Sequence, residues 1–256
     1  MSKRLYSPLR PQSISEVLDT AFQIFAASLP KTLPYGIWII LAGQLGNIYN
    51  LAAGRPLGPL VPHDAPSGIV YVVSLIAVFT LWAAMILRQR AMVQGELNSM
   101  RVELSRALRT IPALLPLAIL MTVAVAVGIV LLVLPGVYLM VALSMAMPAV
   151  VLASKGPIDA MIFSVHLMRG CWWRTLAIFL VTAVIVSVFY ILAIVLVAIA
   201  VQFVRGADVA LVTAASTVLI IALGAFSAPF LGATVLAVFG DLQLRHAAAA
   251  AGPAEI

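Results

Sequence analysis

The stretch GIVLLVLPGVYLMVALSMAMPAVVLASKG, residues 128–156, decides how this chain is threaded. It lies within a run, residues 110–154, that carries no charged side chain. As one helix at about 1.5 Å per residue, this run of about 45 residues would reach roughly 68 Å, more than twice the ~30 Å hydrocarbon thickness of a bilayer. Divided at Pro135 and Gly136, it gives two segments of about 20 residues, the length that one crossing needs. Because proline lacks a backbone donor and glycine tolerates turn geometry, we expect the chain to turn at Pro135 and Gly136.

The composition of the chain indicates the solvent in which it folds. Of its 256 residues, 64% are hydrophobic and 9% are charged, whereas about 25% are charged in soluble domains. The sequence therefore predicts an all-α integral membrane protein. Once several spans of about 20 residues are subtracted, the loops are too short for a separate soluble catalytic domain.

The same argument from length predicts a single polytopic membrane domain over residues 1–256. A kink is expected at Pro229 in the last span, and a flexible tail is expected over residues 246–256. The six predicted spans are residues 33–53, 68–87, 111–133, 137–153, 176–203 and 209–240.

We expect the spans to form three hairpins, each preceded by a short amphipathic helix at the membrane interface. The first, 13–29, begins with Ser13 and Glu16 at capping-box spacing and is expected to end at Pro30. The others are predicted at 91–110 and 157–172. In 91–110 the apolar residues share one helical stripe from which the arginines are excluded: Leu97, Met100, Leu104, Ala107, Leu108 and Ile111.

Orientation follows from the distribution of Lys and Arg. With six spans, all of the 15 basic residues except Arg55 and Arg205 lie on one side of the membrane. The positive-inside bias makes that side cytoplasmic and places both termini there. The expected location is the inner membrane of a bacterium.

The basic and aromatic residues near the predicted interface are candidate anchors. Arginines at this depth interact with anionic headgroups, and tryptophan rings favour the boundary between lipid and water. The predicted anchors are Arg101, Arg106, Arg109, Arg169, Trp172, Trp173 and Arg174.

A longer stretch, LPGVYLMVALSMAMPAVVLASKGPIDAMIFSVHLMRGCWWRTL, resembles a bacterial family named after the membrane domain of glycerophosphoryl diester phosphodiesterase, together with related six-span inner-membrane proteins. The resemblance is carried by the Pro-Gly pair, Pro148, Lys155-Gly156, Ser164 and the segment from Arg169 to Arg174. The resemblance implies a membrane architecture but no catalytic activity, because the phosphodiesterase domain is not present in this chain. Members often carry an acidic residue after the fourth span, where this chain has Ala153 and Ser154, so no role for that carboxylate is transferred.

No ionisable side chain lies in the core of a predicted span, which disfavours proton-coupled transport and intramembrane hydrolysis. The single cysteine, Cys171, and three scattered histidines offer no ligand spacing. We therefore expect no catalytic residue, no metal and no cofactor. An enzyme is the third hypothesis, and it would need Asp159, His166 and Asp241 to meet in space.

Two further polar or small-residue patterns have alternative interpretations. Gln44, Asn47 and Asn50 step along the first span and line either a polar cavity or, more simply, an interhelical or headgroup-level surface. Gly224, Ala228 and Gly232 form a small-residue stripe on the sixth span. Such a stripe serves internal helix packing or, alternatively, a homo-oligomer interface.

The leading hypothesis is a non-enzymatic membrane protein that binds anionic lipid headgroups or a membrane partner and acts in envelope or membrane homeostasis. The alternative is a transporter or channel for an apolar or zwitterionic small molecule, which would use the wall from Gln44 to Asn50. The net charge of +6 is better explained by topology and anionic lipid than by nucleic acid, for which no binding motif is present.

Overall fold

The computed structural model describes residues 10–54, 64–96, 98–203 and 209–251, and within these ranges it contains helices and no strand. Arg55, Arg205 and residues 252–256 of the predicted tail lie outside the described part. The helices are α1 (Ile14–Gly43), α2 (Leu45–Ala52), α3 (Ala65–Gln94), α4 (Met100–Leu131), α5 (Val133–Ala142), α6 (Ala146–Ala153), α7 (Pro157–Met168), α8 (Trp172–Phe203) and α9 (Val209–Ala251).

Six helical segments are long and apolar enough to cross a membrane, with α5 and α6 counted together as one of them. The prediction of an all-helical protein with six helices of transmembrane character is confirmed. By length and composition, this is a multi-pass membrane protein.

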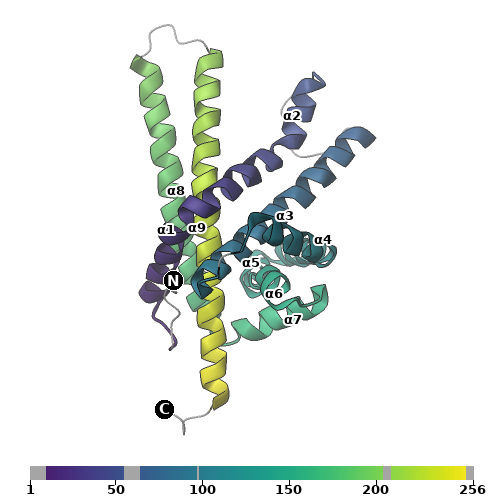
Figure 1. Ribbon diagram of the computed structural model, residues 1–256, viewed down its shortest axis with the longest axis vertical. Coiled ribbons are helices and arrows are strands. Elements are labelled where there is room, and N and C mark those ends of the chain that lie inside the picture. The colour runs from purple at the N-terminus through teal and green to yellow at the C-terminus, as the bar shows by residue number, and fades with distance from the viewer. Residues whose placement is uncertain (1–9, 55–63, 97, 204–208, 252–256) are drawn as a thin grey trace.

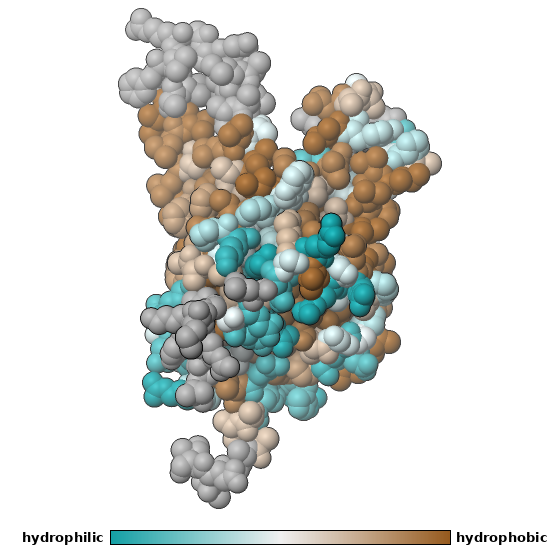
Figure 2. All heavy atoms as spheres, viewed as in Figure 1, coloured by the Kyte–Doolittle hydropathy of each residue, from teal (hydrophilic) through white to brown (hydrophobic). Residues whose placement is uncertain are grey.

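The helices form two diverging arms above a common base (Figure 1). One arm is the pair α8 and α9, which run side by side along the long axis. The other arm holds the upper parts of α1 and α3 together with α2, and α1 crosses α9 between the two arms. Helices α4 to α7 lie together beside the lower half of α9. On the face shown in Figure 2, hydrophobic side chains cover the upper arms and hydrophilic ones gather over the lower half.

The buried core lies in the base, where α1, α3, α4, α6, α7 and α9 meet. Its fully buried side chains include Val17 of α1, Met85 of α3, Leu114 of α4 and Leu242 of α9. By contrast, the outward faces of α4 and α8 expose large apolar side chains along most of their length. Surfaces of this kind are stable in lipid, where exposed apolar groups carry no hydration cost.

The first amphipathic helix is not a separate element. The capping box of Ser13 and Glu16 is present, but Pro30 and Pro34 lie inside α1, which continues to Gly43. The prediction that Pro30 ends the helix is wrong. Within this segment Thr32 also donates its hydroxyl to the Ser28 carbonyl at 3.0 Å. Prolines are tolerated inside membrane helices where neighbouring groups satisfy the backbone.

The second amphipathic helix also differs from the prediction of 91–110. Helix α3 continues to Gln94 and ends at Gly95, whose left-handed φ of 76° closes the helix. Helix α4 then runs without interruption from Met100 through the predicted span boundary at residue 111. The third, α7, is a separate helix, and α9 is helical to Ala251, beyond the predicted start of the tail at residue 246.

The break between α4 and α5 falls at Leu132, which is extended (φ −164°, ψ 137°), rather than at Pro135 and Gly136. Both of those residues lie in the first turn of α5, where a proline costs little because the first N–H groups of a helix have no intrahelical partner. Gly136 instead permits close packing, because a Cβ there would lie 2.7 Å from the backbone nitrogen of Ile129. The predicted turn position is therefore wrong by a few residues.

Glycines also set the contacts of α9 with its neighbours. A Cβ at Gly36 of α1 would collide with the carbonyl oxygen of Ala225. Gly224 faces Ile40 of α1, Gly232 faces Gln89 and Met85 of α3, and Ala228 packs against the core. The small-residue stripe thus lies at contacts inside the molecule. Pro229 lies within α9, and its carbonyl accepts a hydrogen bond from the buried Gln89 at 2.7 Å.

Candidate functional site

Three of the predicted anchors are arginines in the N-terminal half of α4, where they form a basic surface. Arg101, Arg106 and Arg109 are all exposed. Arg101 and Arg109 lie on one face of α4 with Met100, Leu104 and Leu108, because residues three and four apart lie on one side of a helix. The prediction that these arginines are excluded from the apolar stripe is therefore wrong. Of the predicted apolar stripe, Ala107 and Ile111 are buried, whereas Met100 and Leu108 are exposed beside the arginines. Leu97 lies outside the described residues. Cationic and apolar groups therefore share one surface, as lipid headgroups require.

The one buried acid of α4 belongs to a charge cluster that joins three helices. Glu103 is 1% exposed, and its Oε2 accepts a hydrogen bond from the Tyr35 hydroxyl of α1 at 2.8 Å. The same oxygen lies 2.9 Å from Nε of Arg88 of α3. Arg88 also donates to the Asn98 carbonyl at 2.7 Å. Sequence reasoning missed this cluster because Arg88 and Glu103 lie just outside the predicted spans and read as charges facing the cytoplasm.

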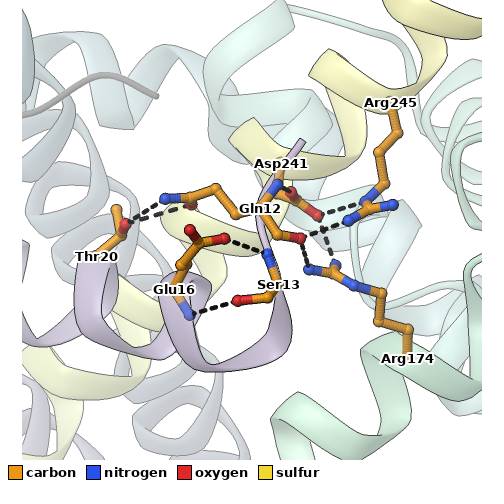
Figure 3. Close-up of polar contacts among 7 residues, drawn as sticks. All are labelled: Gln12, Ser13, Glu16, Thr20, Arg174, Asp241 and Arg245. Atoms are coloured by element: carbon orange, nitrogen blue, oxygen red, sulfur yellow. Dashed lines mark hydrogen bonds and ion pairs between the residues drawn. The ribbon is translucent and has the colours of Figure 1, made fainter. Parts of the chain in front are cut away.

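A second cluster is centred on Asp241 of α9, which is fully buried. Its Oδ1 accepts the backbone N–H of Gln12 at 2.8 Å, and its Oδ2 pairs with Arg174 at 2.6 Å and with Arg245 at 2.9 Å. Figure 3 shows both guanidinium groups turned toward the Asp241 carboxylate and the Gln12 carbonyl. The cluster ties the segment before α1 to α8 and α9. Arg174, predicted as an interface anchor, is therefore engaged inside the protein.

The other predicted anchors lie at the start of α8 and just before it. Arg169 and Trp173 are exposed. Trp172 donates its indole N–H to the Tyr138 carbonyl at 3.1 Å and stacks on the Tyr138 ring at 5.6 Å. Trp172 thus fastens α8 to α5, while Trp173 and Arg169 remain available to the surroundings.

The three residues of the predicted polar wall do not share one environment. Gln44 is exposed and accepts a hydrogen bond from the Asn47 amide at 2.8 Å. Asn50 is buried and donates to the Tyr71 hydroxyl of α3 at 2.9 Å. These three side chains do not line the apolar pocket between α1, α8 and α9 or the pocket at Lys155, both described below.

The residues considered for an enzyme are likewise dispersed. Asp159 and His166 are exposed on α7, and the His166 ring lies 5.5 Å from that of His246. Asp241 is occupied by the two arginines, and no contact between described residues joins it to Asp159 or His166. In the described ranges, no group of three His, Cys, Asp or Glu residues is placed to hold a metal ion.

The fourth span is interrupted in its middle, between α5 and α6. Here the hydroxyl of Ser164 of α7 accepts the backbone N–H of Met145 at 3.1 Å and donates to the Ala142 carbonyl at 2.6 Å. One buried side chain thereby satisfies a donor and an acceptor that the interruption would leave unpaired. The backbone freed at this break is occupied within the protein, so it does not present open ligands for an ion.

An apolar pocket of about 240 Å³ lies where α1, α8 and α9 meet. Phe22, Phe25 and Phe230 form a ring cluster on one side, with centroid separations of 4.9 and 5.5 Å. Phe189, Tyr190 and Phe226 are among the residues on the other sides. The lining suits a hydrocarbon chain, as expected for a pocket between helices in a bilayer.

The chain matches no protein-family model, no curated protein and no solved structure. The resemblance to the membrane-domain family therefore stays a prediction from the residues that carry it.

Proposed function

We propose that this protein is a non-enzymatic component of the bacterial inner membrane that binds anionic lipid headgroups through its basic face, or holds a membrane partner there, in envelope or membrane homeostasis. The observation that carries the proposal is the surface of α4, where exposed arginines and exposed apolar side chains share one face of the helix. Each basic residue near an anionic surface contributes about 1 kcal/mol of attraction. Apolar neighbours add the burial of hydrocarbon in the interface.

The topology is part of the proposal. Three hairpins with both termini in the cytoplasm place Arg101, Arg106 and Arg109 on the inner leaflet, which holds the anionic lipids that attract them. The same topology places Cys171, the single cysteine, on the cytoplasmic side.

Cys171 allows this topology to be tested in the native chain. It is partly exposed, so a membrane-impermeant maleimide should label it in inside-out vesicles and leave it unlabelled in intact spheroplasts. Labelling after detergent solubilisation serves as the control for reactivity. Labelling in intact spheroplasts would place the basic face outside and overturn the proposal.

Lipid binding is tested by native mass spectrometry of the protein released gently from its own membrane. We expect adducts whose mass corresponds to anionic phospholipid, or a second membrane subunit, to persist at activation energies that remove detergent. The proposal would be contradicted if the protein carried neither lipid nor a second subunit while a known lipid-binding membrane protein, treated in parallel, kept its lipid.

A further inference from the structure

We propose that the pocket where the two ends of the charge-free run meet binds the phosphate group of a membrane phospholipid. This inference rests on the proposed lipid-binding function and assigns it to a defined site. The pocket has a volume of about 400 Å³. It is lined by Arg109 and Thr110, where the run begins, and by Ser154 and Lys155, where it ends.

Three cations converge on this pocket from two parts of the chain. Arg106 and Arg109 come from α4, one turn apart, and Lys155 comes from the connection between α6 and α7. The side chain of Arg109 makes no hydrogen bond or ion pair with another described residue. The Lys155 ammonium lies 4.6 Å from the centre of the Phe163 ring, a contact that orients the group without occupying its N–H donors.

No carboxylate among the described residues lines the pocket. Glu103 lies one turn before Arg106 and interacts with it electrostatically, but its hydrogen-bonded oxygen is directed to Tyr35 and Arg88. Asp159 lies on the first turn of α7 and is not part of the lining. The positive charge of the pocket is thus incompletely balanced within the protein, as expected of a site for an anion.

One carbonyl at the C-terminal end of α6, where the helix dipole would repel an anion, is paired with a cation. The Leu152 carbonyl accepts a hydrogen bond from Arg90 at 2.6 Å, and the Ala149 carbonyl accepts the N–H of Lys155 at 3.5 Å. These contacts reduce the negative potential at the helix terminus.

The backbone at the rim is held in an uncommon conformation. Ser154 has a φ of 52° and is the non-glycine residue with a left-handed backbone in the described part of the chain. This is the left-handed conformation with which helices commonly end, since Ser154 is the C-cap of α6. It places the Ser154 hydroxyl, which has no hydrogen-bond partner among the described residues, at the pocket beside Lys155.

The apolar part of the lining favours an amphiphile over a free anion. Leu87, Ala113, Val150 and Val151 line the pocket together with the cations. Because the charge-free run begins and ends here, the pocket lies at the boundary between hydrocarbon and polar residues, the depth of lipid phosphates. A soluble phosphate would leave these apolar side chains in contact with water, whereas the glycerol and first methylenes of a phospholipid would cover them.

The test compares two double variants that each remove two positive charges. Arg109→Gln with Lys155→Gln changes the pocket, and Arg10→Gln with Lys31→Gln changes exposed cations that neither line it nor belong to the basic surface of α4. Binding of phosphatidylglycerol to each purified protein is titrated by native mass spectrometry, with inorganic phosphate as a competitor. Unfolding temperatures in detergent establish that both variants are folded.

We expect the pocket variant to lose affinity for phosphatidylglycerol by at least about tenfold and the control to stay within about twofold. An equal loss in both variants would overturn the assigned pocket and leave general lipid binding standing. Inorganic phosphate binding as tightly as phosphatidylglycerol would assign the pocket to a free anion and overturn the lipid assignment. A wild-type protein that binds no anionic lipid would overturn both this inference and the proposed function.

Discussion

Replacing Glu103 by leucine is expected to lower the free energy of unfolding by about 3–5 kcal/mol, the cost of leaving one partner of a buried ion pair uncompensated. In the wild-type protein the Glu103 carboxylate accepts a hydrogen bond from the Tyr35 hydroxyl. It also forms an ion pair with Arg88, whose side chain is 13% exposed. In the Glu103→Leu variant, the Arg88 guanidinium keeps its hydrogen bond to the Asn98 carbonyl but loses its counter-charge. The measurement is equilibrium unfolding in mixed micelles at increasing fractions of sodium dodecyl sulfate. Glu96→Gln, at an exposed acid in the connection before α4, is the matched control.

A second variant separates the charge from the shape of the site. In Arg88→Met with Glu103→Leu, both charges are removed together, and paired apolar replacements of buried ion pairs are often neutral or stabilising. We expect this double variant to recover more than half of the loss caused by Glu103→Leu. If the double variant is as unstable as the single one, the lost stability comes from packing and the ion pair is not its source.

The helical class and the number of membrane-crossing helices could be predicted because they depend on local properties. Length and hydropathy alone separate the six apolar segments, and the capping box of Ser13 and Glu16 is a contact between residues three apart. Neither depends on which helices become neighbours. This is the level at which a single sequence is informative.

The ends of the helices were predicted less well, and proline is the common cause. Pro30 favours a helix end, yet it lies inside α1, which continues to Gly43. Pro135 favours a turn, yet it lies in the first turn of α5, and the extended residue is Leu132. Proline removes a donor, but whether that ends a helix depends on partners that only the folded chain supplies.

The candidate site was predicted in part. The exposed arginines of α4 follow from helical spacing, but the sequence placed Arg174 with them, and the structure pairs it with Asp241, 67 residues away. Glu103 lies outside the predicted spans, and its partners come from α1 and α3, so no local pattern indicates its burial. Contacts between distant segments have no local pattern, so the buried clusters and the pocket at Lys155 required the structure.

The second large loss of stability is expected in the cluster where Asp241 binds the segment before α1 (Figure 3). Asp241→Asn keeps the shape of the side chain but removes the charge that balances Arg174 and Arg245. Because hydrogen bonds to charged groups contribute about 1.5–3 kcal/mol, we expect the free energy of unfolding to fall by about 2–3 kcal/mol. The value lies below that for Glu103 because the two arginines are 18% and 29% exposed and can turn toward water. Asp19→Asn, at an exposed acid of α1, should change stability by less than about 0.5 kcal/mol.

The same variant should also show where the stability is lost. The Gln12 N–H donates to Asp241, and the Gln12 carbonyl accepts from both arginines, so weakening the carboxylate should release the segment that precedes α1. Hydrogen exchange followed by mass spectrometry is expected to show faster exchange in peptides covering residues 10–16, with little change in those covering the core of α3. Uniform acceleration across all helices would mean that Asp241 supports the whole bundle. Unchanged exchange at residues 10–16 would mean that the segment is held by its contacts with α1, through the Gln12 amide on Thr20, and not by the carboxylate.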